Sequence, residues 1–340
     1  MNSLADLKLA ELAAVKDTPL SALQTEKLFD RIFNGELSAE ELRAYLEATA
    51  ERRPTVDEIV GAARSMRARM REVSAPEGAI DLCGTGGDGH GTLNISTAVS
   101  FVVAGAGVPV AKHGNRAASS KSGAADILEA LGVKIGLEQD AASEVLAKTG
   151  IVFLFAQTHH PSMRHVAPVR AQIKRRTIFN LLGPLASPAR VTRQLTGVFA
   201  PEWLTPYAEA MKALGSTRVL VVHGRDGMDE VTSTDVTDAA SLMGGTIARL
   251  ELTPEQAGLP RSTLGDLKGG GAAENAARLT ALLEGEAGPY RDIVLLNAAA
   301  ALVVADRAQD IMAAKDLAAR SLDGGAGLAK LKELIEASNA

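Results

Sequence analysis

Apolar residues near the N-terminus recur three and four positions apart, which is the spacing of amphipathic helices. Ile59, Ala62, Ala63 and Met66 show this spacing clearly. From Leu4 to about Arg71 good helix formers dominate, and no alternating strand pattern occurs. The first part of the chain is therefore expected to be entirely helical.

Helix starts within this part can be placed from capping residues. Ser38 precedes AEELRAYLEATA and Thr55 precedes VDEIVGAARSMRARM, each with an acid in the first turn. SAPEG (Ser74 to Gly78) then interrupts the pattern and predicts a linker. We expect a helical domain over residues 1–73.

Beyond the linker, short apolar runs alternate with helical patterns. Strands are predicted at AIDLC, VPVAK, IVFLFA and RVLVVHG, and helices over residues 96–106, 123–131 and 202–214. This alternation indicates an α/β fold with a mostly parallel central sheet flanked by helices. Ligands of such sheets bind at the carboxyl ends of the strands.

The alternation is interrupted between Pro161 and Ala189. SMRHVAPVRAQIKRR looks helical, and NLLGPLASP looks like a loop. We expect roughly residues 165–190 to pack onto the N-terminal helices, so that the α/β domain comprises residues 77–164 and 191–340. The C-terminal quarter is expected to be mostly helical, with turns that contain paired glycines.

Composition narrows the classes of function. Aromatic residues make up only 3% of the chain and hydrophobic residues 46%, so the core must be mainly aliphatic. The net charge of -5 argues against a nucleic-acid partner or a polybasic membrane binder. The longest apolar run, IVLLNAAAALVVA, is too short to span a membrane and contains Asn297. The N-terminus does not resemble a signal peptide, so we expect a cytoplasmic protein without a membrane partner.

The glycine-rich stretch GTGGDGHGTLNIST follows the first predicted strand. Backbone amides in such a loop, with the N-terminus of the next helix, favour anion binding. Its glycines fit the dinucleotide-binding spacing, but the following strand ends in Lys112 and His113 rather than an acid. A purely structural loop is the other alternative, and its many polar side chains argue against it. We interpret the stretch as a phosphate cradle.

Two further motifs follow predicted strands. KHGNRAASSKSGAAD offers Lys112, Ser119 and Ser120 as phosphate partners, although alone it could be a solvated loop with a helix cap. GMDEVTS carries the adjacent acids Asp229 and Glu230, which suit Mg²⁺ beside a phosphate, although an acidic pair on a loop is usually only solvated surface.

The segment HHPSMRHVAPVR contains an arginine and histidines that could take part in binding. Arg170 could hold a carboxylate with its planar guanidinium. His160 and His165 are spaced five apart, which places them on different faces of a helix and argues against shared metal ligation. KRRT (Lys174 to Thr177) is a short basic cluster. Cys83, the only cysteine, is expected to be a small core residue rather than a nucleophile.

Together, GTGGDG…NIST, KHGNR, the Arg170 segment, GPLASP and GMDEV resemble the anthranilate phosphoribosyltransferase family over essentially the whole chain. One departure is Ser187 in GPLASP, where the family commonly has Asn; this position shapes a loop rather than the chemistry. The resemblance implies a fold of the nucleoside phosphorylase/phosphoribosyltransferase type and a homodimer formed through the helical domains. It implies transfer of phosphoribose from phosphoribosyl pyrophosphate to the amine of anthranilate, with Mg²⁺ as cofactor.

The resemblance also assigns site residues by motif. Arg170 and Lys112 would be the catalytic residues, and Ser96, Asp229 and Glu230 would hold Mg²⁺. Anthranilate would contact Gly84, Asn115 and Arg170. Phosphoribosyl pyrophosphate would be bound by Gly84, Gly87, Asp88, Thr92, Asn94, Ile95, Ser96, Thr97, Lys112, His113, Gly114, Asn115, Arg116, Ala117, Ala118, Ser119, Ser120 and Ala124.

Three alternatives remain open at this point. A pyrimidine nucleoside phosphorylase shares the architecture but needs no Asp-Glu metal pair. A related phosphoribosyltransferase-like protein could bind another ligand, including a nucleic acid, and a non-catalytic phosphate-binding module would bind without turnover. GMDEV favours the transferase over the phosphorylase, and the presence of both KHGNR and Arg170 argues against the related protein. The transfer requires charge neutralisation on the leaving pyrophosphate and placement of the amine rather than a strong base, and the sequence offers Lys112 and a metal pair for this purpose.

Overall fold

The N-terminal part of the molecule is helical, as predicted. The computed structural model describes residues 9–117 and 121–340. Its first helices are α1 (Leu9–Ala14), α2 (Ala22–Asn34), α3 (Ala39–Glu51) and α4 (Val56–Arg69). Ser38 and Thr55 are the N-caps of α3 and α4, and each forms a capping box with the glutamate three residues later. Residues 71–78 then lack regular structure, in agreement with the predicted linker.

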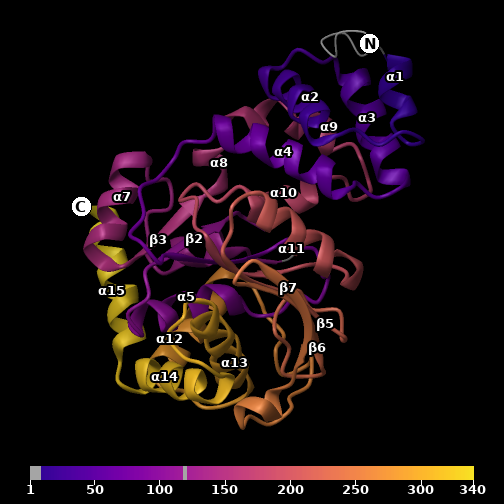
Figure 1. Cartoon of the computed structure of the whole chain (residues 1–340). Coiled ribbons are helices and arrows are strands. Elements are labelled where there is room, and N and C mark those ends of the chain that lie inside the picture. Colours follow the sequence, from indigo (N-terminus) through magenta and orange to yellow (C-terminus); the bar gives the residue numbers. More distant parts are fainter. Residues whose placement is uncertain (1–8, 118–120) are drawn as a thin grey trace.

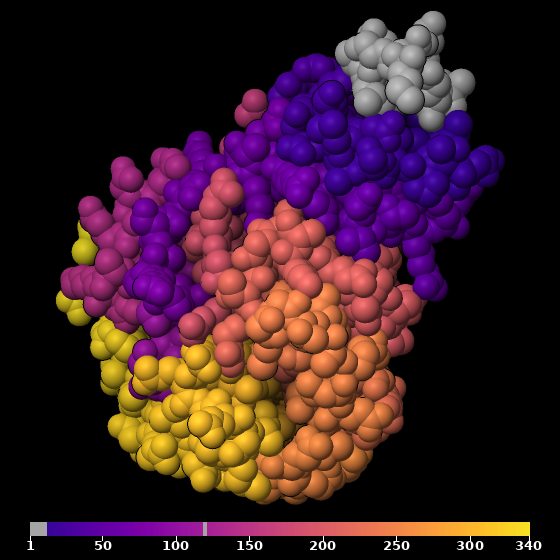
Figure 2. Space-filling model, viewed as in Figure 1, coloured from indigo at the N-terminus to yellow at the C-terminus, as the bar shows by residue number. Residues whose placement is uncertain are grey.

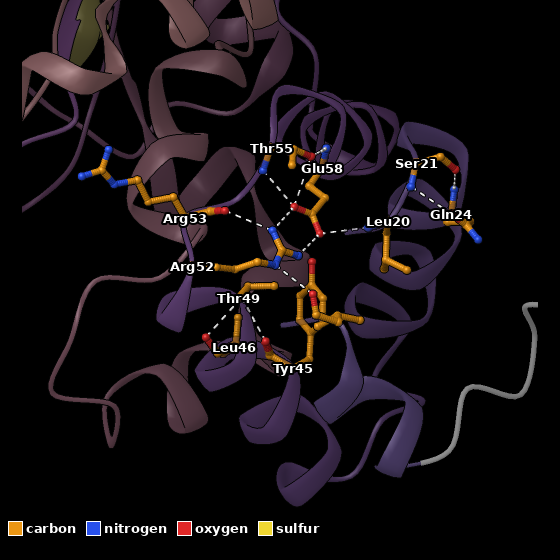
Figure 3. Close-up of polar contacts among 11 residues, drawn as sticks. Leu20, Ser21, Gln24, Tyr45, Leu46, Thr49, Arg52, Arg53, Thr55 and Glu58 are labelled. Atoms are coloured by element: carbon orange, nitrogen blue, oxygen red, sulfur yellow. Dashed lines mark hydrogen bonds and ion pairs between the residues drawn. The ribbon is translucent and has the colours of Figure 1, made fainter. Parts of the chain in front are cut away.

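A buried ion pair lies inside the helical part (Figure 3). Both carboxylate oxygens of Glu58 accept hydrogen bonds from the Arg52 guanidinium, at 2.5 and 2.8 Å. The backbone amides of Leu20 and Thr55 donate to the same carboxylate. Glu58 has no exposed surface, so these four donors replace the water that the charge loses.

A seven-stranded sheet forms the centre of the α/β part, in the order β3-β2-β1-β4-β5-β6-β7. The strands β3, β2, β1, β4 and β5 are parallel, and β6 and β7 continue the sheet in antiparallel fashion. The bounds are β1 (Ile80–Gly84), β2 (Val110–Gly114), β3 (Ile151–Phe155), β4 (Arg193–Gly197), β5 (Arg218–Gly224), β6 (Thr237–Met243) and β7 (Thr246–Leu252). The glycine loop follows β1 and the acidic loop follows β5, so both loops lie at the edge of the sheet formed by the carboxyl ends of the parallel strands.

The sheet separates two hydrophobic cores. On β5, Leu220 and Val222 belong to one core, and Val219 and Val221 belong to the other. The first core contains the C-terminal helices. The second core continues into the N-terminal helices and also contains Val166, Val169 and Phe179. Residues from the 165–190 segment therefore pack with the N-terminal helices.

Helices cover both faces of the sheet, and the N-terminal helices project from one end of the α/β body (Figures 1 and 2). No helix in the described part of the chain is long and apolar enough to cross a membrane. The remaining elements are α5 (Ile95–Gly105), α6 (Ala124–Ala130), α7 (Gln139–Thr149), α8 (Ala156–His159), η2 (Pro161–His165), α9 (Ala167–Arg170), α10 (Phe179–Leu185), η3 (Pro201–Trp203), α11 (Leu204–Ala213), η4 (Pro254–Ala257), α12 (Ala272–Leu283), α13 (Pro289–Val304), α14 (Ile311–Asp323) and α15 (Ala326–Asn339).

The segment between β3 and β4 differs from the prediction. SMRHVAPVRAQIKRR forms only a 3-10 turn and the short α9, because Pro168 has no backbone N–H with which to continue a helix from the preceding turn; α9 instead starts anew with Pro168 in its first turn. NLLGPL, expected to be a loop, lies in helix α10 although it contains Pro184. The leucines at 181, 182 and 185 are buried in the second core, and this burial outweighs the low helix propensity of glycine and proline.

Candidate active site

The glycine loop after β1 is held against the acidic loop after β5. Gly86, Gly87, Gly89 and Gly91 all have positive φ, from 61° to 80°, a conformation that glycine adopts without strain. The Gly86 amide donates a 2.8 Å hydrogen bond to Oδ2 of Asp229. The sequence motifs GTGGDG and GMDEV, 143 residues apart at this bond, therefore lie in direct contact.

Two further glycines let Asp229 come this close. A Cβ on Gly84 would stand 2.5 Å from Oδ2 of Asp229, and a Cβ on Gly197 would stand 1.5 Å from its carbonyl oxygen. The acidic loop is also tied internally, because Asp226 accepts hydrogen bonds from the Met228 amide and the Thr232 hydroxyl. Asp229 is thus held by its hydrogen bond to Gly86, by close packing against Gly84 and Gly197, and by the hydrogen bonds within its own loop.

The acidic pair lies in an environment that disfavours negative charge. Burial and the nearby carboxylate of Asp88 raise the pKa of Asp229 to about 6. Burial and Asp229 raise the pKa of Glu230 to about 8, which the Lys112 ammonium and the Ser96 amide only partly offset. A bound divalent cation would favour the ionised form of both carboxylates. These oxygen donors, with the nearby Ser96 hydroxyl, fit Mg²⁺, which takes few protein ligands and completes its shell with phosphate and water. In the described residues, no cluster of three or more His, Cys, Asp or Glu side chains is placed to hold a metal by itself.

Lys112 lies beneath the N-terminus of α5. Its ammonium donates to the Leu82 carbonyl at 2.5 Å and to the Ser96 hydroxyl at 3.1 Å. Its exposed fraction is only 4%, and burial lowers its pKa. In this position Lys112 counters the charge of Glu230 and orients Ser96, both of which border the glycine loop.

The two predicted phosphate loops are joined by an asparagine from α12. The amide of Asn275 donates to Oδ1 of Asn94 and to the hydroxyl of Ser122, both at 2.9 Å. Its Oδ1 accepts from the Gly270 amide at 2.7 Å. Asn94 precedes α5, and Ser122 lies in the loop after β2, so Asn275 fixes the spacing between these segments. Asn275 was not identified from the sequence because no local motif marks it.

The arginine of the loop after β2 is paired with acids of α6 at the surface. Arg116 pairs with Asp126 and Glu129, and Asp126 also accepts from the amides of Ala117 and Gly123. Asn115 is exposed at the start of this loop. A Cβ on Gly114 would stand 2.8 Å from the Phe153 ring and 3.4 Å from the Cβ of Ala124 at the start of α6. The predicted phosphate-binding residues Ala118, Ser119 and Ser120 lie outside the described residues.

Several residues that were predicted to bind phosphoribosyl pyrophosphate have side chains that face the core. Ile95 and Thr97 are buried in α5, and the Thr97 hydroxyl has no hydrogen-bond partner among the described residues. His113 is buried, with its ring 5.1 Å from that of His160, and burial and the neighbouring histidines keep its pKa well below the ordinary value. Thr92 forms an isolated bridge with Lys268. Any direct contact of Ile95 or Thr97 with a phosphate would come from the backbone.

Arg170 ends α9 with a half-buried guanidinium that makes no hydrogen bond or ion pair with any residue in the described ranges. Burial lowers its pKa. A buried cation without a partner is costly, so this group is suited to receive an anion. Arg176, from the basic cluster KRRT, donates a 2.6 Å hydrogen bond to the Gly87 carbonyl and stacks 4.0 Å above the Phe199 ring.

Cys83 and Ser187 were also singled out in the sequence, and both lie among residues that pack the interior of the protein. Cys83 is half-buried and contacts the carboxylate of Asp81 and the amide of Gln194. Burial raises the pKa of its thiol, so it is a poor nucleophile, as expected. Ser187 is buried, and its hydroxyl has no partner among the residues described.

Comparisons with known proteins agree with this geometry. The descriptions "Glycosyl transferase family, helical bundle domain" and "Glycosyl transferase family, a/b domain" match residues 12–70 and 76–328. Anthranilate phosphoribosyltransferase of Methylocella silvestris is 54% identical over 94% of this chain and 92% of its own length. That of Sinorhizobium medicae is 53% identical over 99% of this chain and all of its own length.

Solved structures give the same result. The crystal structure of anthranilate phosphoribosyltransferase from Thermus thermophilus is 41% identical, with a TM-score of 0.92 over 98% of this chain and 99% of that one. The Saccharomyces cerevisiae enzyme, solved in complex with PRPP and Mg, is 25% identical, with a TM-score of 0.88 over the same shares. The chain belongs to the anthranilate phosphoribosyltransferase family.

Proposed function

We propose that this chain transfers the phosphoribosyl group of phosphoribosyl pyrophosphate to the amine of anthranilate, giving N-(5-phosphoribosyl)anthranilate and pyrophosphate in tryptophan biosynthesis. The observation that carries the proposal is the 2.8 Å hydrogen bond between the Gly86 amide and Asp229. It joins a loop suited to phosphate with a carboxylate pair suited to Mg²⁺, which is the combination that a pyrophosphate leaving group requires.

The phosphoribosyl pyrophosphate site is proposed to lie between the glycine loop, the N-terminus of α5 and the loop after β2. Other backbone amides of the glycine loop and those of Asn94, Ser96 and Thr97 would donate to phosphate oxygens. The amides of Gly86 and Ile95 already donate to Asp229 and Leu93. Lys112 would hold the Ser96 hydroxyl in place and lower the local negative charge. When bound through Asp229, Glu230 and Ser96, Mg²⁺ would neutralise charge on the pyrophosphate.

Anthranilate is proposed to bind through Arg170, with Gly84 and Asn115 bordering its site. The Arg170 guanidinium, which has no partner among the described residues, can donate two parallel hydrogen bonds to the carboxylate and so orient the ring. The amine of anthranilate is neutral and already nucleophilic, so placement beside the sugar carbon is the main contribution of the protein. No general base is assigned.

The division into a helical domain of residues 1–73, joined by residues 165–190, and an α/β domain of residues 77–164 and 191–340 is part of the proposal. So are a homodimer formed through the helical domains and a cytoplasmic location. The shared second core supports the packing of residues 165–190 on the helices.

An assay with the protein, Mg²⁺, phosphoribosyl pyrophosphate and anthranilate tests the proposal. Transfer should remove the fluorescence of free anthranilate and release one pyrophosphate for each anthranilate consumed. Phosphorolysis of pyrimidine nucleosides with no loss of anthranilate would instead identify the phosphorylase. Binding of phosphoribosyl pyrophosphate without turnover would identify a non-catalytic module.

A further inference from the structure

One polar side chain interrupts the longest apolar run of the sequence. Asn297 lies in the middle of α13, whose residues from Ile293 to Leu302 are all buried, and its own exposed fraction is 1%. A buried amide must find hydrogen-bond partners or it destabilises the fold. Alanine or leucine would suit this helix better, so the asparagine calls for an explanation.

The partners of Asn297 lie in the acidic loop. Its Oδ1 accepts from the Val231 amide at 2.9 Å, and its Nδ2 donates to the Val231 carbonyl at 2.8 Å. Nδ2 also donates to the Ile293 carbonyl one turn earlier in α13, at 2.9 Å. The two bonds to Val231 hold both of its backbone polar groups, in the residue that directly follows Glu230.

The same asparagine borders the site itself. Asn297, Glu230 and Ser96 line one small cavity beneath the end of β1. The Val231 amide belongs to the peptide group that joins Glu230 to Val231. Rotation of this peptide would redirect the Glu230 side chain, and the bond from the Val231 amide to Asn297 opposes that rotation. The bond from Asn297 to the Val231 carbonyl holds the next peptide group, between Val231 and Thr232.

We infer that Asn297 is a positioning residue that sets the orientation of the Glu230 carboxylate for the divalent cation. The inference rests on the proposed assignment of Asp229 and Glu230 to Mg²⁺. It needs no contact between Asn297 and the metal. Groups that orient metal ligands in this way typically affect metal affinity about 10–100-fold.

Asn297→Ser is the variant that best separates the bonds to the acidic loop from the bond within the helix. A helical serine can donate to the carbonyl four residues earlier, here Ile293, but it is too short to replace both bonds to Val231. It therefore keeps the bond within the helix and removes those to the loop. Asn297→Ala, which removes all three, is the second variant. Ser321→Ala is the matched control, because it removes a buried 2.7 Å hydrogen bond to Val102 elsewhere in the same core.

Mn²⁺ binding, measured by electron paramagnetic resonance in the presence of phosphoribosyl pyrophosphate, is the main readout. Both Asn297 variants should bind Mn²⁺ about 10–100-fold more weakly, with KM for anthranilate at saturating metal unchanged. Ser321→Ala should bind Mn²⁺ as the unmodified protein does. Folded Asn297 variants with unchanged Mn²⁺ affinity would overturn the inference.

Two further measurements separate the possible failures. If Asp229→Asn/Glu230→Gln also binds Mn²⁺ normally, the metal assignment in the proposed function is wrong. If that pair loses Mn²⁺ but the Asn297 variants do not, only the positioning role is wrong. Hydrogen exchange of the unmodified protein provides a check that requires no variant to fold: the Val231 amide should be protected, and exchange at the rate of an exposed loop would overturn the inference.

Discussion

The carbonyl oxygen of Asp229 lies against Gly197 so closely that a Cβ at position 197 would stand 1.5 Å from it. Gly197→Ala should therefore displace the acidic loop. A shift of about 1 Å in such a site can cost about 100-fold in rate, so we expect a loss of this order in kcat. Steady-state kinetics should be compared with Gly136→Ala, since no atom lies within 4 Å of a Cβ at that position. Equal activity of the two variants would show that the close approach is unimportant.

Arg170 should act on one substrate only. Arg170→Ala removes the charge-assisted bond to the anthranilate carboxylate, worth about 1.5–3 kcal/mol, so KM for anthranilate should rise about 10- to 100-fold. KM for phosphoribosyl pyrophosphate should change little. Arg175→Ala, which removes an exposed arginine five residues later, is the control. Equal rises in both KM values would contradict the carboxylate role.

Asn275 should act on the other substrate. Asn275→Ala removes the bonds that join Asn94 and Ser122, so the phosphate loops should lose their fixed spacing. Two neutral hydrogen bonds are worth about 1–3 kcal/mol together, and we expect KM for phosphoribosyl pyrophosphate to rise about tenfold or more. Thr280→Ala on the same helix removes only a bond within α12 and should leave this KM unchanged.

Burial raises the pKa of Asp81 from 3.8 to about 6. The folded protein therefore holds this proton more tightly than the unfolded chain, so the contribution of Asp81 to stability falls as pH rises from about 4 to 6. The difference corresponds to about 3 kcal/mol. Asp81→Asn should abolish this pH-dependent decrease in stability. The free energy of unfolding, measured with denaturant at pH 4 and pH 7 for both proteins, tests this. The variant should gain stability relative to the unmodified protein at the higher pH; a constant difference would contradict the assignment.

The Arg52–Glu58 pair should matter for stability rather than catalysis. Glu58→Gln leaves the Arg52 charge without its partner, and breaking a buried pair costs about 3–5 kcal/mol. Glu47→Gln, in the exposed pair with Arg43, should cost less than about 1 kcal/mol. Urea unfolding compares the two. If the two variants lost the same free energy of unfolding, the buried ion pair would contribute no more to stability than the exposed one.

The parts of the fold that were predictable have strong local patterns. IVFLF and RVLVVHG are rich in β-branched residues, and they form β3 and β5 as expected. The strands β4 (RQLTG) and β6 (TDAASLM) were missed because their polar and small residues carry no strand signal. Gln194 on β4 is buried only because Cys83 and the Pro184 carbonyl satisfy its amide. Such partners exist only after the chain has folded.

The same distinction applies to the site. Motifs that are contiguous in sequence, such as GTGGDG and GMDEV, could be recognised, because their function depends on local spacing. Asn275, Asn297 and Arg176 act on loops that lie 66 to 181 residues away along the chain. Asn297 had a local signal as a polar residue inside an apolar run, and Arg176 lies in the basic cluster KRRT, but neither signal identified the residue that it contacts.

The bond from Arg176 to the Gly87 carbonyl has a mechanical consequence. Arg176 lies between Ile173 and Ile178, which pack in the core shared with the N-terminal helices, whereas Gly87 extends from the central sheet. The bond thus links the segment that packs with the N-terminal helices to the glycine loop. Any displacement of this segment relative to the sheet must either break the bond or move the glycine loop with it, so the position of the segment and the shape of the loop are mechanically coupled.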